Sequence, residues 1–272
     1  MRNNQRRTGQ SAPSPSSPAS SQANLAYVVP TEFVELPSRG LFYDVNHPLH
    51  NQETVEIKFM TAKEEDILSS MALIKNGLVI DRLLSNIIVL DVDPQSLTVG
   101  DRNAIMIAAR ISSYGRNYEV SLTCTACYRP SEFTFDLNNS TVTGDCFDNE
   151  YLKDNNVVFN EEQRTFDVEL PQSKVKVSIQ PITGEDEKSV LDADEESAVT
   201  SLLSTFVKSI DGDANAVSQF IEVMPAGDSR FLRKLYATLM PNVELKDTFV
   251  CEKCSHIKET EVPLTAEFFW PE

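Results

Sequence analysis

Residues 100–137 read GDRNAIMIAARISSYGRNYEVSLTCTACYRPSEFTFDL, and this stretch decides the fold. Apolar residues recur at helical spacing over 101–113, and apolar and polar residues alternate over 118–123 and 132–137. The two alternating runs flank a C-x-x-C pair. The stretch therefore predicts a helix followed by a β-hairpin with a cysteine knuckle at its tip.

The same signals return near the C-terminus, where residues 227–264 read GDSRFLRKLYATLMPNVELKDTFVCEKCSHIKETEVPL. A constant offset of 127 residues aligns Gly100 with Gly227, Asp101 with Asp228, Cys124 with Cys251, Cys127 with Cys254, Glu132 with Glu259 and Leu137 with Leu264. A shared register of this kind indicates an internal repeat.

The upstream elements follow the same order in both halves. A strand pattern over 54–60 precedes a capping box at Thr61, and helical patterns cover 78–89 and 101–113. A strand over 174–180 precedes a similar cap at Thr183, and helical patterns cover 197–210 and 214–223, with another helix opening at 227. The two caps align at an offset of 122, so the second copy carries about five extra residues. We predict an α+β fold built by internal duplication of a strand, helices, β-hairpin unit.

Composition divides the chain into four parts. Residues 1–24 contain three arginines and a Ser/Pro/Ala run, which predicts a disordered arm. Residues 25–137 form the first repeat with an extended lead-in segment, and 138–163 form a polar linker that contains Cys146. Residues 164–272 form the second repeat, which ends in an aromatic segment.

Each C-x-x-C pair supplies two thiolates, and a structural zinc ion takes four ligands in a tetrahedron. If the two hairpins meet, Cys124, Cys127, Cys251 and Cys254 form one zinc-ribbon-like site, with one structural zinc per chain. Two alternatives stay open: knuckles that have lost the metal and serve as packing, and redox-active dithiols. His256 is a candidate substitute ligand. Cys146 has no second cysteine at the spacing of a metal-binding pair, which indicates an ordinary free thiol.

Composition and motifs exclude several classes of function. With 272 residues and 41% apolar content the chain can bury a real core, and no run approaches the length of a membrane span. The net charge of −17 repels nucleic acids and anionic membranes. Signatures of metalloproteases, serine hydrolases and nucleotide-binding loops are absent. We expect a protein without a signal peptide that is neither an enzyme nor a binder of nucleic acid, membrane or small-molecule substrate.

Several motifs together resemble the baseplate hub proteins of T4-like contractile-tailed phages. They are LPSRGLFY at 36–43, MTAKEEDIL at 60–68, GDRNAIMIAARISSYG at 100–115 before the first knuckle, and the closing EFFWPE. The resemblance implies a protein of the virion tail baseplate, assembled in the host cytoplasm with other phage baseplate hub proteins as partners. It implies either a built-in hub subunit or an assembly factor, and no catalytic residues.

Two further features concern partners. Phe268, Phe269 and Trp270 are candidate anchors for a partner protein, or they fold back onto the core. Three arginines flank the third helix of the first repeat and are expected to form surface salt bridges, the alternative being ion pairs with a neighbouring subunit: Arg102, Arg110 and Arg116. The alternative function is a zinc-ribbon adaptor for nucleic acid or transcription, which the acidic residues around both knuckles disfavour.

Overall fold

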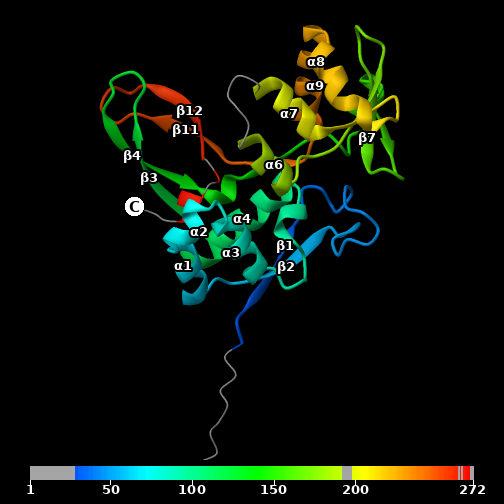
Figure 1. Cartoon of the computed structure of the whole chain (residues 1–272). Coiled ribbons are helices and arrows are strands. Elements are labelled where there is room, and N and C mark those ends of the chain that lie inside the picture. Colours follow the sequence, from blue (N-terminus) through cyan, green and yellow to red (C-terminus); the bar gives the residue numbers. More distant parts are fainter. Residues whose placement is uncertain (1–27, 192–197, 263, 265, 270–272) are drawn as a thin grey trace, which may run out of the picture.

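The structure is a computed structural model that describes residues 28–191, 198–262, 264 and 266–269. The predicted disordered arm, residues 1–24, lies outside this range. The fold is α+β, as predicted. In Figure 1, α1 to α4 gather in one lobe with β1 and β2, while α6 to α9 lie beside β7 in a second lobe. Among the described residues, no helix combines the length and apolar content that crossing a bilayer requires.

The first half of the chain runs to residue 137. Its elements are β1 (Thr31–Glu35), β2 (Thr54–Lys58), α1 (Ala62–Leu68), α2 (Met71–Lys75), α3 (Val79–Ile87), the 3-10 helix η1 (Pro94–Ser96), α4 (Val99–Tyr114), β3 (Asn117–Thr123) and β4 (Pro130–Asp136). The predicted capping box at Thr61 is present, with the hydroxyl accepting from the Lys63 N–H and the Glu64 carboxylate accepting from the Thr61 N–H. This reciprocal cap fixes where α1 begins.

Residues 138–163, expected to form a polar linker, contain regular structure. They hold the 3-10 helix η2 (Leu137–Asn139, which starts one residue earlier), β5 (Thr141–Thr143), α5 (Asn149–Asp154) and β6 (Val158–Asn160). β5 pairs antiparallel with a strand of the second half, and β6 is the edge of a four-stranded sheet. Both strands of the segment therefore pair with strands of the second half.

The second half starts at residue 164. Its elements are β7 (Thr165–Glu169), β8 (Lys176–Ile179), α6 (Gly184–Leu191), α7 (Ala198–Phe206), β9 (Val207–Ile210), the 3-10 helix η4 (Ala214–Ala216), α8 (Val217–Val223), α9 (Ala226–Leu239), β10 (Asn242–Glu244), β11 (Lys246–Val250), β12 (Ile257–Glu261) and the 3-10 helix η5 (Ala266–Phe269). The sheet order is β6-β7-β8-β9, and all pairs are antiparallel.

One helix prediction is wrong at its C-terminal end. The helical pattern over 197–210 continues only to Phe206, and residues 207–210 form β9. Val207 and Ile210 are buried, and the segment hydrogen-bonds along β8. The edge of β8 supplies hydrogen-bond partners for the backbone of residues 207–210. This pairing in the tertiary structure outweighs the helical pattern of a short apolar run.

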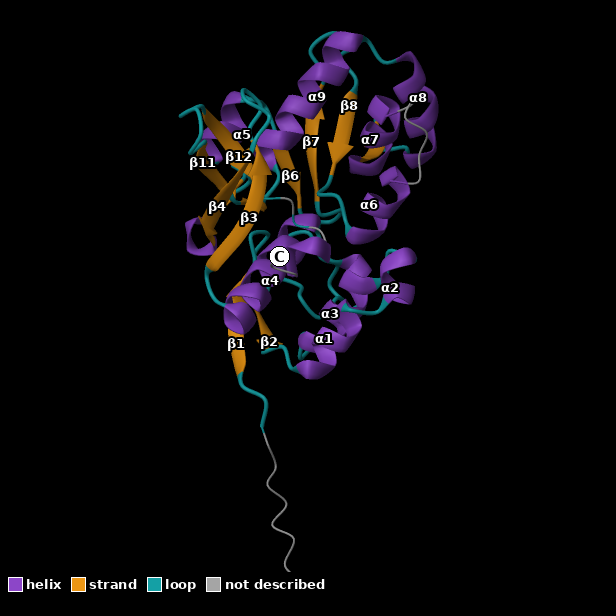
Figure 2. Cartoon of the chain, turned by 90° about the vertical axis from the view of Figure 1, so that its left-hand side faces the viewer, coloured by secondary structure: helices purple, strands orange, loops and turns teal. Residues whose placement is uncertain are grey.

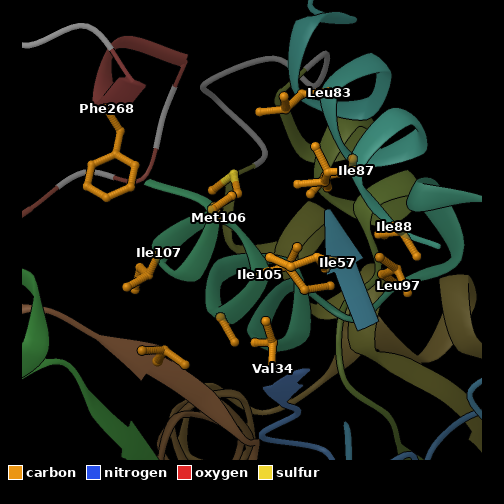
Figure 3. Packing of buried hydrophobic residues seen from close by; sticks show 14 of the residues in the cluster. Val34, Ile57, Leu83, Ile87, Ile88, Leu97, Ile105, Met106, Ile107 and Phe268 are labelled. Atoms are coloured by element: carbon orange, nitrogen blue, oxygen red, sulfur yellow. The ribbon is translucent and has the colours of Figure 1, made fainter. Parts of the chain in front are cut away.

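Two large apolar cores hold the molecule together. The first core joins β1, β2, α1, α3 and α4, and Figure 3 shows Val34, Ile57, Ile87 and Ile105 converging around α4. Phe268, from the end of the chain, belongs to this same core. The second core joins the four-stranded sheet with α7, α8 and α9, and it takes in Phe42 from the first half. Each core therefore contains residues from the opposite end of the sequence.

A buried ion-pair cluster joins the two halves. Asp81 on α3 accepts from the Arg102 guanidinium at 3.0 Å and also from the Lys188 ammonium on α6. Arg102 is 7% exposed, so the expected surface salt bridge is in fact a buried one. Burial alone would raise the pKa of Asp81, but these two cations outweigh it and hold that pKa below its ordinary value.

Candidate metal centre

The two cysteine knuckles lie side by side although 123 residues separate them in sequence. The β3–β4 and β11–β12 hairpins adjoin in both views of the molecule (Figures 1 and 2). Each hairpin is a two-stranded antiparallel sheet with its knuckle at the turn. The hairpins predicted from alternating polarity are therefore present, and their tips meet.

Both knuckles have the same backbone hydrogen bonds. In the first, the Cys124 N–H donates to the Arg129 carbonyl at 3.0 Å, and the Tyr128 N–H donates back to the Cys124 carbonyl at 2.9 Å. In the second, Cys251 and His256 form the first bond at 2.9 Å, and Ser255 donates back to Cys251 at 2.8 Å. Tyr128 and Ser255 both have positive φ, 57° and 56°. The same local fold thus presents two sulfur atoms from each hairpin.

The four sulfur atoms form a compact group. Cys124 Sγ lies 3.7 Å from Cys254 Sγ, and Cys127 Sγ lies 3.8 Å from Cys251 Sγ. All four lie within 4.8 Å of one another. A tetrahedron with metal–sulfur bonds of about 2.3 Å has sulfur–sulfur edges of about 3.8 Å. The donor set and its spacing could hold one metal ion and are consistent with zinc.

Apolar side chains seal the inner side of this group. Cys124 and Cys251 are 0% and 1% exposed, whereas Cys254 is exposed. Phe133 and Phe249 lie in edge contact with ring centroids 5.6 Å apart, and with Leu122 they form the small core beneath the sulfurs. The sulfur group and this small core therefore lie together between the two hairpins.

The sulfurs are electrostatically unequal. The Cys127 N–H is the largest influence on Cys124 and, with the Ala126 N–H, lowers the pKa of its thiol to about 6. The His256 N–H favours the Cys254 thiolate, but burial and the three neighbouring sulfurs outweigh it and raise the pKa of Cys254 to about 12. Four adjacent thiolates repel one another, so all four ionise together only around a cation.

The fifth cysteine, Cys146, and the candidate ligand His256 lie outside this group of four sulfur atoms. Cys146 is buried in the second core, where burial raises the pKa of its thiol to about 12. His256 Nε2 lies 3.4 Å from Thr125 Oγ1, and the ring is not one of the four clustered donors. Four cysteines complete a tetrahedral set without it.

Two of the three aromatic residues proposed as partner anchors do not face solvent. Phe268 and Phe269 are 0% and 1% exposed, and the Phe268 ring lies 5.3 Å from that of Tyr118. The anchor interpretation is therefore wrong for these two residues, and Trp270 lies outside the described residues. Of the other two arginines expected to form surface salt bridges, Arg110 is buried at 1% exposure. Arg116 forms an exposed ion pair with Asp136 at 3.9 Å.

Two buried aspartates, Asp101 and Asp228, align at the repeat offset of 127 residues, but the sequence pattern predicts no role for their side chains. Asp101 accepts from the Ser38 N–H at 3.0 Å and the Ser38 hydroxyl at 2.5 Å. Asp228 accepts from the Gln172 and Ser173 N–H groups, both at 2.9 Å. Both donor turns follow a Leu-Pro pair, at 36–37 and 170–171, and this shared dipeptide is the sequence signal that could have located them.

Comparison with known proteins finds one family that covers most of the chain. Residues 42–270 match a protein family described as T4 bacteriophage base plate protein. No curated protein and no solved structure matches the chain. The matched span includes both knuckles, both buried aspartates and most of both cores. The chain belongs to the T4 bacteriophage base plate protein family.

Proposed function

We propose that this baseplate protein is a non-enzymatic structural or assembly component of the baseplate hub. In this proposal it docks other hub proteins through a duplicated scaffold, pinned by one zinc ion bound to Cys124, Cys127, Cys251 and Cys254. The family match supports the tail location, and the four-sulfur group is the observation that carries the scaffold role. Assembly of such a component takes place in the host cytoplasm.

Matching contacts support the duplication. In each half a strand leads through a Leu-Pro turn into a second strand, and a later helix places a fully buried aspartate against that turn. Each such helix is followed by a hairpin with a knuckle of the same backbone pattern. Independent origin of all three features in the same order is improbable, so one ancestral unit is the simpler source.

The site chemistry supports a structural metal. When bound, zinc supplies a rigid four-bond link between the hairpins, and its binding energy adds directly to folding energy. The cysteines themselves orient the tips, and Phe133 and Phe249 exclude water from the inner side. All four ligand positions are filled by protein, which is typical of structural sites, since catalytic zinc keeps one position for water.

The buried carboxylates support a non-enzymatic role. Asp101 and Asp228 are both 0% exposed, and each is engaged by the turn that it anchors. A general acid or base must reach substrate, whereas these groups are enclosed and fully used as hydrogen-bond acceptors. They are parts of the scaffold.

Counting this chain in purified phage particles by quantitative mass spectrometry, against a tail protein of known copy number, tests the function. A few copies per particle would identify a built-in hub subunit. Absence from particles together with stalled tails on gene deletion would identify an assembly factor. Normal tail assembly without the gene would contradict both roles.

Zinc analysis of the purified protein tests the site separately. We expect about one zinc per chain, lost equally in Cys124→Ser and Cys251→Ser because each half supplies two ligands to one ion. Cys146→Ser is the matched control and should keep its zinc, since Cys146 lies in the second core. Loss in only one of the two knuckle variants would contradict a shared site.

The nucleic-acid adaptor remains the alternative, and the charge around the knuckles disfavours it. Glu132, Glu252 and Glu259 are all exposed on the hairpins. Carboxylates at these positions repel phosphate groups. Salt-sensitive binding of a DNA duplex at physiological ionic strength would favour the adaptor over the hub scaffold.

A further inference from the structure

The outward face of α9 carries three cations that lie close together. Arg230, Arg233 and Lys234 are all exposed, and their spacing of three and four residues places them on one face of the helix. None of the three forms an ion pair with a residue that the structure describes. Because the net charge of the chain is −17, this basic stripe is a local exception, and it attracts carboxylate groups.

A largely apolar pocket opens beside the basic stripe. Its volume is about 540 Å³, within the range of about 300–1,000 Å³ that ligand-binding pockets occupy. One wall is a row of α9 residues at helical spacing: Arg233, Tyr236, Ala237 and Met240. Arg233 therefore belongs both to the basic stripe and to the wall of the pocket.

The other walls of the pocket come from both halves of the chain. Three partly buried apolar residues lie there, one each from α4, the segment before α6, and α7: Val99, Ile182 and Leu202. A large apolar side chain that entered the pocket would remove their remaining surface from water, which is favourable. The exposed Glu187 of α6 also lines the pocket and disfavours a carboxylate on that side, whereas Arg233 favours one on the α9 side.

We propose that the pocket and the basic stripe form one docking site for an acidic segment of another phage tail protein. The segment inserts a large apolar side chain into the pocket, and its carboxylates pair with the cations of α9. Arg233 is the cation among the described lining residues, while Arg230 and Lys234 lie outside the lining. A ligand that engages all three must therefore extend along α9 by about one helical turn, 5.4 Å or so, which suits a chain segment better than a small molecule. The inference rests on the proposed function, because it gives the hub component a surface for a neighbour.

Binding of the full-length protein to an array of short peptides tests the docking site. The peptides tile the tail proteins of the phage and the sequence of this chain itself. We expect binding to peptides of other tail proteins that are acidic and contain a large apolar residue. This binding should weaken between about 0.1 M and 1 M salt, because the Debye length falls from about 10 Å to about 3 Å. Binding only to peptides of this chain, or to no acidic tail peptide, would overturn the inference.

Charge reversal tests the basic stripe. Arg230→Glu combined with Lys234→Glu should weaken binding of these peptides at least about tenfold, because attraction becomes repulsion. Lys75→Glu combined with Arg82→Glu is the matched control, since it makes the same change in charge at exposed positions of the first lobe. Equal losses in the two double variants would overturn the inference.

A substitution at the pocket mouth tests the apolar part of the site. Ala237→Trp should weaken binding, because the indole occupies the pocket that the ligand side chain would enter. Ala237 is exposed, so the fold tolerates the larger side chain. Unchanged binding by this variant would overturn the inference. Counting of phage particles tests the hub role separately, so the chain can be present in particles while the docking site fails.

Discussion

Asp101 and Asp228 occupy matching places in the two halves, yet their carboxyl groups are held differently. Burial is the largest influence on Asp101 and raises its pKa despite hydrogen bonds from Ser38 and Tyr43. Burial also acts to raise the pKa of Asp228, but the N–H groups of Gln172 and Ser173 outweigh it and hold that pKa below its ordinary value. The same residue type therefore makes opposite contributions to the pH dependence of stability.

The first prediction follows from these opposite shifts. A carboxyl whose pKa is lower in the folded than in the unfolded protein stabilises the fold above the unfolded pKa of about 3.9. This stabilisation is lost as pH falls through the folded pKa. Asp228→Asn should therefore cost about 1–3 kcal/mol at pH 7, with the gap from wild type shrinking below about pH 4. For Asp101 the pKa is higher in the folded protein than in the unfolded chain. Ionisation of Asp101 therefore lowers the stability of the folded protein as pH rises above about 4. The gap for Asp101→Asn should therefore widen on acidification.

Urea unfolding at a series of pH values between 7 and 3 measures both gaps. The two variants control for each other, because each removes one buried carboxylate from the same place in its own half. Gaps that change in the same direction with pH would contradict the assignment.

At the scale of elements, the sequence predicts best those parts that carry their own local signal. Thr61 and Glu64 cap α1 through contacts within four residues, and alternation alone identifies β3. By contrast, β5 has three residues and forms only by pairing with β10, about 100 positions further along the chain. No window of sequence contains that information, and β9 was missed for the same reason.

The candidate metal site also has features that the sequence predicts and features that only the structure gives. Spacing and the repeat identify the four cysteines, because each knuckle is a local motif. The sulfur separations of 3.7 and 3.8 Å depend on how the two hairpins meet, and only the structure gives them. The buried state of Phe268 was likewise inaccessible to sequence, since an aromatic chain end suits either a partner or the core.

The second prediction concerns the two hairpins. A two-stranded hairpin is marginally stable alone, and here a small core around Phe133 and Phe249 joins the two hairpins. In the zinc-bound protein that we propose, removal of the metal by a chelator should therefore speed amide hydrogen exchange in β3, β4, β11 and β12 by at least about tenfold, which corresponds to about 1.4 kcal/mol. Exchange in β7 and β8, which lie in the second core, provides the internal control. Unchanged exchange in the hairpins would show that the metal does not support the junction.

At the scale of the whole molecule, the two halves are interlocked. The first core takes Val243, Leu245 and Phe268 from the far end of the chain, while the second core takes Phe42. Asp81 and Lys188 tie α3 to α6 across the same boundary. The two halves of the chain therefore share their apolar cores, and the first core includes buried residues that lie after position 240.

The third prediction tests this dependence of the first core on the chain end. Phe268→Ala should lower the free energy of unfolding by about 3–5 kcal/mol, because the ring is fully buried against Tyr118 and its removal leaves a cavity. Phe33→Ala is the matched control in the same half: its ring is 70% exposed, and the change should be within about 0.5 kcal/mol. Urea unfolding followed by circular dichroism measures both. If Phe268→Ala cost no more than Phe33→Ala, the chain end would be an appendage, and residues 28–137 should fold without it. If the predicted loss appears, the first core depends for its stability on a residue more than 130 positions after its last helix, α4.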